Sequence, residues 1–101
     1  MARFDLYKTR SQRIPYLLEV QSDTLETLAS RVVIPVVSLE QAGAARLPRL
    51  NPGIMIDGVP HILMPQEMTT IPASKLRRPV GNIAEHRDAI TAAMDFLFQG
   101  F

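Results

Sequence analysis

The sequence predicts a mainly β (α+β) domain, in which a curled antiparallel sheet or small barrel is followed by one C-terminal helix. Two observations support this fold class. Eight prolines lie between positions 15 and 79, and because proline breaks helix interiors, no long helix fits there. The segment after Pro79 has no proline and is rich in alanine and other good helix formers, which favours a helix.

Three segments have the character of strands. In "RFDLYK", residues 3–8, apolar Phe4 and Leu6 alternate with Asp5 and Tyr7, a period of two. The segments "YLLEVQ" and "RVVIPVVS" are rich in aliphatic and β-branched residues, which pack well on a pleated surface. Pro35 lies inside the latter and cannot donate to a ladder, so it predicts an edge strand or a bulge.

The segment 54–64, "IMIDGVPHILM", predicts a hairpin. Asp57 and Gly58 tolerate positive φ and lie between two apolar runs, as a two-residue turn requires. The preceding residues, 39–53, have no strand period. We expect one short helical turn within 39–45 and then a loop.

The segment 81–98 predicts the helix. Asn82 is a suitable N-cap, and Glu85 three residues later completes an arrangement like a capping box. The apolar face consists of Ile83, Ile90, Met94 and Leu97, widened by Ala89, Ala93 and Phe96. Near its end the helix is apolar almost all round, so its own sheet or another subunit must cover its second side.

Length and composition narrow the class of protein. We expect a single domain over residues 1–101, since this length supports one core. A hydrophobic content of 47% is too high for a disordered chain, and no apolar run approaches the roughly 20 residues that span a bilayer. The chain has no cysteine and no secretion signal, which suits the cytoplasm. A net charge of +1 does not indicate nucleic-acid binding, and we interpret Lys75, Arg77 and Arg78 as a solvated loop.

No residue pattern indicates a reaction. The sequence has neither a glycine-rich phosphate loop nor clustered metal ligands, so we predict no cofactor and no metal site. His61 is interpreted as an ordinary strand residue. His86 lies in "AEHRD", but neighbouring helical residues point about 100° apart, so these side chains form a solvated face and do not converge. We therefore predict no catalytic residue.

Several motifs in order resemble the CcdB family of bacterial toxin–antitoxin toxins. The strongest is Val20-Gln21-Ser22-Asp23 after a strand, followed by Arg31 and by Val33-Ile34-Pro35. The resemblance continues in "RFDLYKT", "MTTIP" (68–72), "EHRDAI" (85–90) and "MDFLFQGF" (94–101), and is weakest over residues 39–49.

The resemblance implies an SH3-like barrel with a terminal helix, of the kind shared by CcdB and MazF, and a homodimer. It also implies a protein without enzymatic activity. Such toxins bind the DNA gyrase A subunit and trap gyrase on cleaved DNA, and a cognate antitoxin with a disordered segment releases them. Toxin and antitoxin of related pairs together repress their own operon. The toxin itself is expected to contact DNA only indirectly, through gyrase or through the complex with the antitoxin.

The resemblance also implies site residues. The expected gyrase contacts are Thr24, Leu25, Asp95, Phe98, Gln99, Gly100 and Phe101. The alternative for Phe98 is burial in the core of the dimer interface. Antitoxin contacts are expected at Lys8, Arg10 and Arg13, in a loop for which a solvated hairpin is the other interpretation. The well-known members end in Trp-Gly-Ile, whereas this chain has Gln99, which lacks the π-face for a cation–π contact with a gyrase arginine.

Two alternatives remain open. The MazF and Kid endoribonuclease toxins share this fold, although their R-P-V segment lies near residue twenty and here "RRPV" occurs only at 77–80. The other alternative is a homologue that binds an antitoxin but no longer poisons gyrase.

Overall fold

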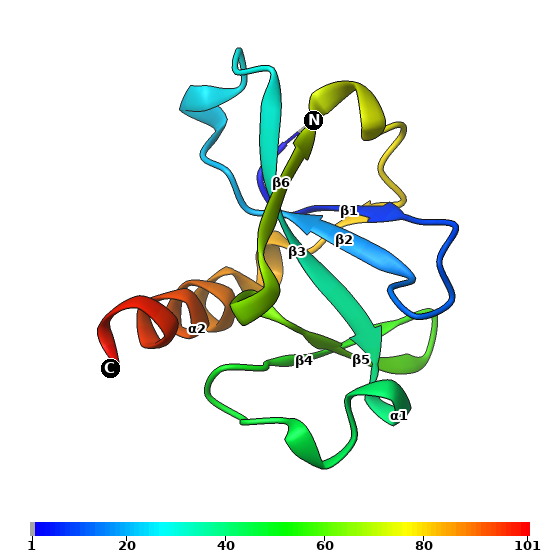
Figure 1. The fold of residues 1–101 in the computed structure, drawn as a ribbon, viewed down its shortest axis with the longest axis vertical. Coiled ribbons are helices and arrows are strands. Elements are labelled where there is room, and N and C mark those ends of the chain that lie inside the picture. The colour runs from blue at the N-terminus through cyan, green and yellow to red at the C-terminus, as the bar shows by residue number, and fades with distance from the viewer. Residues whose placement is uncertain (1) are drawn as a thin grey trace.

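The longest strand, β3 (Ser30–Ser38), is the centre of an antiparallel sheet in the computed structural model, which describes residues 2–101 (Figure 1). The strand order is β4-β5-β3-β2-β1-β7, and β6 pairs with β3 as well. The other strands are β1 (Asp5–Lys8), β2 (Tyr16–Glu19), β4 (Gly53–Ile56), β5 (Val59–Leu63), β6 (Thr69–Pro72) and β7 (Gly81–Asn82). The helices are α1 (Leu39–Ala42) and α2 (Arg87–Gln99). This curled antiparallel half-barrel with one C-terminal helix confirms the predicted fold class.

Pro35 lies in this central strand, so the prediction of an edge strand is wrong, and the register with β2 runs through Pro35 without the alternative bulge. On one side, Leu17 of β2 pairs with Pro35. On the other side, β3 pairs with β6 up to Val33 and with β5 from Val36, and the Pro35 carbonyl accepts from the Met64 amide at 3.0 Å. The nitrogen and the carbonyl of one strand residue point to the same side of the strand. Pro35 therefore lacks its N–H on the side of β5 and β6, at the point where β5 replaces β6 as the partner of β3.

The predicted hairpin is confirmed as β4 and β5. Asp57 and Gly58 form its turn with φ of 51° and 77°, the positive values that a two-residue turn needs. The short helical turn expected within residues 39–45 is also present, as α1 followed by the 3-10 turn η2 (Gly43–Ala45).

Both faces of the sheet are buried near β1. The main core combines Leu6, Leu18 and Ile34 with Ile90 of α2, and a smaller cluster on the other face holds Tyr7, Val33 and Leu76. Successive side chains of residues 3–8 therefore alternate between two buried faces of the sheet, and not between the core and solvent.

Helix α2 begins later than the sequence predicts. Asn82 is not its N-cap, because Asn82 forms β7 and pairs with Asp5 of β1. Its side chain donates to the Asp5 carboxylate at 2.9 Å and accepts from the Ala84 amide at 2.9 Å. A 3-10 turn, η5 (Ala84–His86), follows, and the α-helix starts at Arg87. Of the predicted apolar face, Ile90 and Ala93 are buried, Ile83 is buried ahead of the helix, and Ala89 is exposed.

Candidate functional site

The C-terminal tail, residues 99–101, leaves α2 at Gly100. Gly100 adopts the left-handed conformation with φ 80° and ψ 9°, and its amide donates to the Phe96 carbonyl at 2.9 Å. Glycine is the usual residue at such a helix end because it has no Cβ to clash. The chain therefore turns out of the helix at Gly100, and it carries Phe101 into solvent with 76% of its surface exposed.

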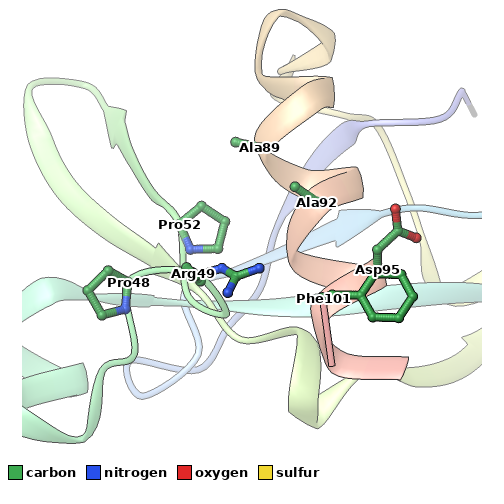
Figure 2. A pocket seen from close by; sticks show the side chains of 7 residues that line it. All are labelled: Pro48, Arg49, Pro52, Ala89, Ala92, Asp95 and Phe101. Carbon is green, nitrogen blue, oxygen red and sulfur yellow. The ribbon is translucent and has the colours of Figure 1, made fainter. Parts of the chain in front are cut away.

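Phe101 borders a shallow groove between the end of α2 and the loop before β4 (Figure 2). The groove encloses about 430 Å³ and is lined by Pro48, Arg49, Pro52, Ala89, Ala92, Asp95 and Phe101. The guanidinium carbon of Arg49 lies 4.4 Å from the centre of the Phe96 ring. This cation–π contact joins the loop to the helix beside the tail.

The end of α2 gathers the expected tail contacts. Asp95, Phe98 and Gln99 are exposed on its last turns, ahead of Gly100 and Phe101. Phe98 has 68% of its surface exposed. Two phenylalanine rings in solvent at one helix end form an apolar patch without cover in the single chain.

Thr24 and Leu25 lie elsewhere. They belong to the 3-10 turn η1 (Asp23–Leu25), which Ser22 caps by accepting from the Thr24 amide at 3.3 Å. Leu25 is 47% exposed. In Figure 1 this turn (light blue) is separate from the end of α2 (red), so the expected gyrase contacts form two patches on one chain.

Arg31 supports the loop that carries Thr24 and Leu25. Its side chain is 97% buried, and Nη1 donates to the Leu28 carbonyl at 2.6 Å, while Nη2 donates to the Glu26 carbonyl. Gln21 adds a bond from Nε2 to the Leu25 carbonyl at 3.0 Å. The loop backbone is therefore held from the protein interior. No structural role was predicted for Arg31 from the sequence. Its position directly before the aliphatic residues 32–34 could have indicated a charged side chain that turns into the protein interior.

Arg31 also forms a buried ion pair with Glu19. Arg31 Nε lies 3.5 Å from Glu19 Oε2, but the contact does not have hydrogen-bond geometry, so this Nε has no hydrogen-bond partner. Glu19 Oε1 accepts from the Tyr7 hydroxyl at 3.3 Å. Burial raises the pKa of Glu19 although Arg31 opposes this, and burial together with the Glu19 charge raises the pKa of Tyr7 strongly.

The β1–β2 loop, residues 9–15, carries two of the expected antitoxin contacts. The Thr9 amide donates to the Pro15 carbonyl at 2.9 Å, and Ser11 Oγ accepts from the amides of Arg13 and Ile14, both at 3.1 Å. These bonds order the loop, and Arg10 and Arg13 are exposed on it.

Lys8 and Arg10 line a groove together with a segment distant in sequence. The groove encloses about 620 Å³ and its cations are Lys8, Arg10, Lys75, Arg77 and Arg78. The pairing of β7 with β1 explains this proximity, because it returns the residues before β7 to the end of β1 where the loop starts. The interpretation of residues 75–78 as an isolated solvated loop missed this groove, and Arg13 does not line it.

The two histidines border one small hollow of about 240 Å³ beside Arg46. His61 is buried in β5, where Nδ1 lies 2.8 Å from the Val59 carbonyl and the ring meets Tyr16 edge-on at 5.4 Å. His61 is thus the strand residue that was expected. His86 is half-buried and ends η5, so its placement on a solvated helix face is wrong.

Residues 2–101 contain no cluster of three or more His, Cys, Asp or Glu side chains able to hold a metal ion. No helix over the same residues is long and apolar enough to cross a membrane.

The fold and the sequence are both similar to those of known proteins. In structure the chain is similar to the Mycobacterium tuberculosis toxin MazF-mt6, with a TM-score of 0.73 over 93% of this chain and 95% of that chain. The sequence identity is 16%, so this likeness concerns the fold alone. The family model described as CcdB protein matches residues 3–100, nearly the whole chain. The protein therefore belongs to the CcdB family.

Proposed function

We propose that this protein is the toxin of a type II toxin–antitoxin pair, which binds the DNA gyrase A subunit and traps gyrase on cleaved DNA. It acts as one domain in the cytoplasm and has no enzymatic activity of its own. Membership of the CcdB family supports this proposal.

The observation that carries the proposal is the exposed apolar end of α2. Phe101 is 76% exposed, and Gly100 directs it away from the helix. Burying one phenylalanine side chain in a partner contributes roughly 1.5–3 kcal/mol. A tail of this kind is suited to enter a pocket of another protein, with Thr24 and Leu25 supplying a second contact.

The active form in this proposal is a homodimer. Phe96 and Leu97 are half-buried and Phe98 is exposed, so the last turns of α2 keep apolar surface that a second copy covers. Light scattering measures the mass in solution. Phe98→Glu is expected to weaken the dimer, whereas Val59→Glu, at an exposed apolar site at the start of β5, leaves it unchanged.

Neutralisation is assigned to a cognate antitoxin that contacts Lys8, Arg10 and Arg13. The ordered loop presents Arg10 and Arg13 to solvent, where carboxylates of a partner reach them.

The test is a cleavage assay with gyrase, ATP and supercoiled plasmid, in which double-strand breaks are scored after detergent and protease. Full-length protein is expected to accumulate breaks, and a variant without residues 99–101 is expected to accumulate none. Val59→Ala, at the start of β5, serves as a control for loss of an exposed apolar side chain elsewhere. Breaks that persist in the truncated variant contradict the role of the tail, and no breaks with either protein contradicts gyrase poisoning.

One observation favours a second candidate function, RNA cleavage. His61 and His86 border one hollow with Arg46, which places two imidazole side chains and a guanidinium around the same space. Cleavage of single-stranded RNA that is lost in His86→Gln would establish it. Tight antitoxin binding without either activity would instead identify a homologue that no longer poisons gyrase.

A further inference from the structure

The groove between the β1–β2 loop and residues 74–78 is strongly basic. Five of the chain's eleven lysines and arginines line it, and no acidic residue does. All five are exposed, and within residues 2–101 none has a carboxylate at ion-pair distance. The rest of the chain is more acidic than basic, since the chain as a whole has a net charge of +1. The positive potential is therefore concentrated in this groove.

The floor of the groove is apolar. Leu17, Ile71 and Leu76 line it and are more buried than the exposed cations, and the first two are half-buried, so part of their surface is accessible. These side chains pack on the Tyr7–Val33 cluster of the sheet, which gives the floor a fixed shape. A ligand that fits this groove carries negative charges beside apolar groups.

The groove favours a polypeptide over a nucleic acid. Single-stranded nucleic acids bind largely by stacking bases on exposed aromatic rings. The only aromatic residue of this lining, Tyr7, is 3% exposed and its hydroxyl donates to Glu19. Branched aliphatic side chains match leucine-like groups of a peptide, and the basic rim matches its carboxylates.

We infer that this groove binds an extended acidic polypeptide segment, whose carboxylates meet Lys8, Arg10, Lys75, Arg77 and Arg78 and whose apolar side chains contact Leu17 and Ile71. The inference deepens the proposed function, on which it rests for one point only, that the segment belongs to the antitoxin. It extends the expected contacts at Lys8 and Arg10 by three cations and an apolar floor.

The groove and the tail are on different sides of the molecule. In Figure 1 the β1–β2 loop (dark blue) lies across the sheet from the C-terminal end of α2 (red). A segment in the groove therefore leaves residues 99–101 uncovered, and deletion of these residues leaves the groove intact.

The experiment uses the full chain and a labelled synthetic peptide of about 12 residues, an extended span of about 40 Å, in which Glu and Leu alternate. Fluorescence anisotropy gives the Kd. Two charge reversals at exposed arginines change the net charge equally: Arg78→Glu in the groove, and Arg87→Glu on α2 as its control. We expect Arg78→Glu to weaken binding about tenfold or more, a free-energy difference of about 1.4 kcal/mol, and Arg87→Glu to have little effect. Circular dichroism melts check that both variants fold.

Two competitor probes complete the design. A peptide with Ser in place of Leu is expected to bind more weakly, and an oligothymidylate of equal charge is expected not to displace the labelled peptide. Equal effects of the two charge reversals, no binding of the peptide, or displacement by the oligothymidylate overturns the inference. A protein that fails the gyrase assay but still binds the peptide, with or without residues 99–101, would contradict the toxin proposal and support the inference about the groove.

Discussion

Arg31 and Glu19 form an ion pair inside the protein, with Nε and Oε2 3.5 Å apart and both side chains at least 96% buried. The pair joins the core to the surface, because the other nitrogens of Arg31 bind carbonyls of the loop that carries Thr24 and Leu25. Its energetic role and its role in positioning that loop can be separated by substitution.

Arg31→Met is expected to destabilise the fold by about 3–5 kcal/mol, because it leaves the Glu19 carboxylate buried without its partner. Urea unfolding measures this loss. The double variant Glu19→Gln/Arg31→Met is expected to recover part of it, since no charge is then left in the interior. A double variant less stable than Arg31→Met would contradict this account of the pair.

Glu19 also makes stability depend on pH. Its pKa is raised in the folded state above the ordinary value of 4.5, chiefly by burial, so above pH 4.5 the folded protein holds a proton that the unfolded chain has lost. The contribution of Glu19 to stability is therefore largest below pH 4.5 and decreases as the pH rises through the raised pKa. Urea unfolding from about pH 4 to pH 7 is expected to show this decrease relative to Glu19→Gln. Parallel curves for the two proteins would exclude it.

Gly100→Ala tests the direction of the tail. The new Cβ meets no atom within 4 Å, so the only penalty is the left-handed backbone, about 1–2 kcal/mol. Because the chain end can relax, we expect an unchanged urea midpoint and reduced trapping of cleaved DNA. Gly58→Ala, with φ of 77° and equally open space, is the control and should trap breaks normally. Full activity of Gly100→Ala would show that the direction of Phe101 is unimportant.

Gln99→Trp tests the departure from the tryptophan of the well-known family members. A tryptophan at this exposed position supplies the π-face that glutamine lacks, and a cation–π contact contributes about 0.5–2 kcal/mol. The concentration needed for half-maximal trapping is expected to fall about two- to thirtyfold. Gln99→Leu controls for added apolar surface. An equal gain from leucine would mean that no cation of the target faces this position.

Arg49→Met removes the cation over Phe96 while keeping a long side chain. We expect a loss of about 0.5–1 kcal/mol in the free energy of unfolding. Arg13→Met is the control, because Arg13 is exposed on the β1–β2 loop. If both substitutions have the same effect on urea unfolding, the Arg49–Phe96 contact does not stabilise the groove beside the tail.

Local patterns in the sequence predicted the elements that local chemistry determines. Asp57 and Gly58 specify their turn by conformational preference alone, and the alanine-rich, proline-free segment forms α2. The position of Gly100 at the helix end follows from the same kind of preference.

Features that depend on distant partners were missed. Asn82 has the residue type of a helix cap, but pairing with Asp5, far away in sequence, makes it a strand residue. Pro35 suits a central strand only because β5 replaces β6 beside it. The basic groove depends equally on a long-range pairing, which brings Arg77 and Arg78 to Lys8. Spacing along the chain contains none of this information.

The pairing of β1 with β7 has a consequence for the order in which the sheet forms. Leu6 pairs with Gly81, and the Val80 amide donates to the Leu6 carbonyl at 2.7 Å. One edge of β1 therefore has no partner until the ribosome has added residues 80–82, much later in synthesis. During synthesis β1 therefore has β2 as its only neighbour and exposes an open strand edge, the kind of surface on which nascent chains aggregate. Closing it is a late, high-contact-order step. The basic groove is completed in the same step, so a newly made chain acquires it only when the sheet closes.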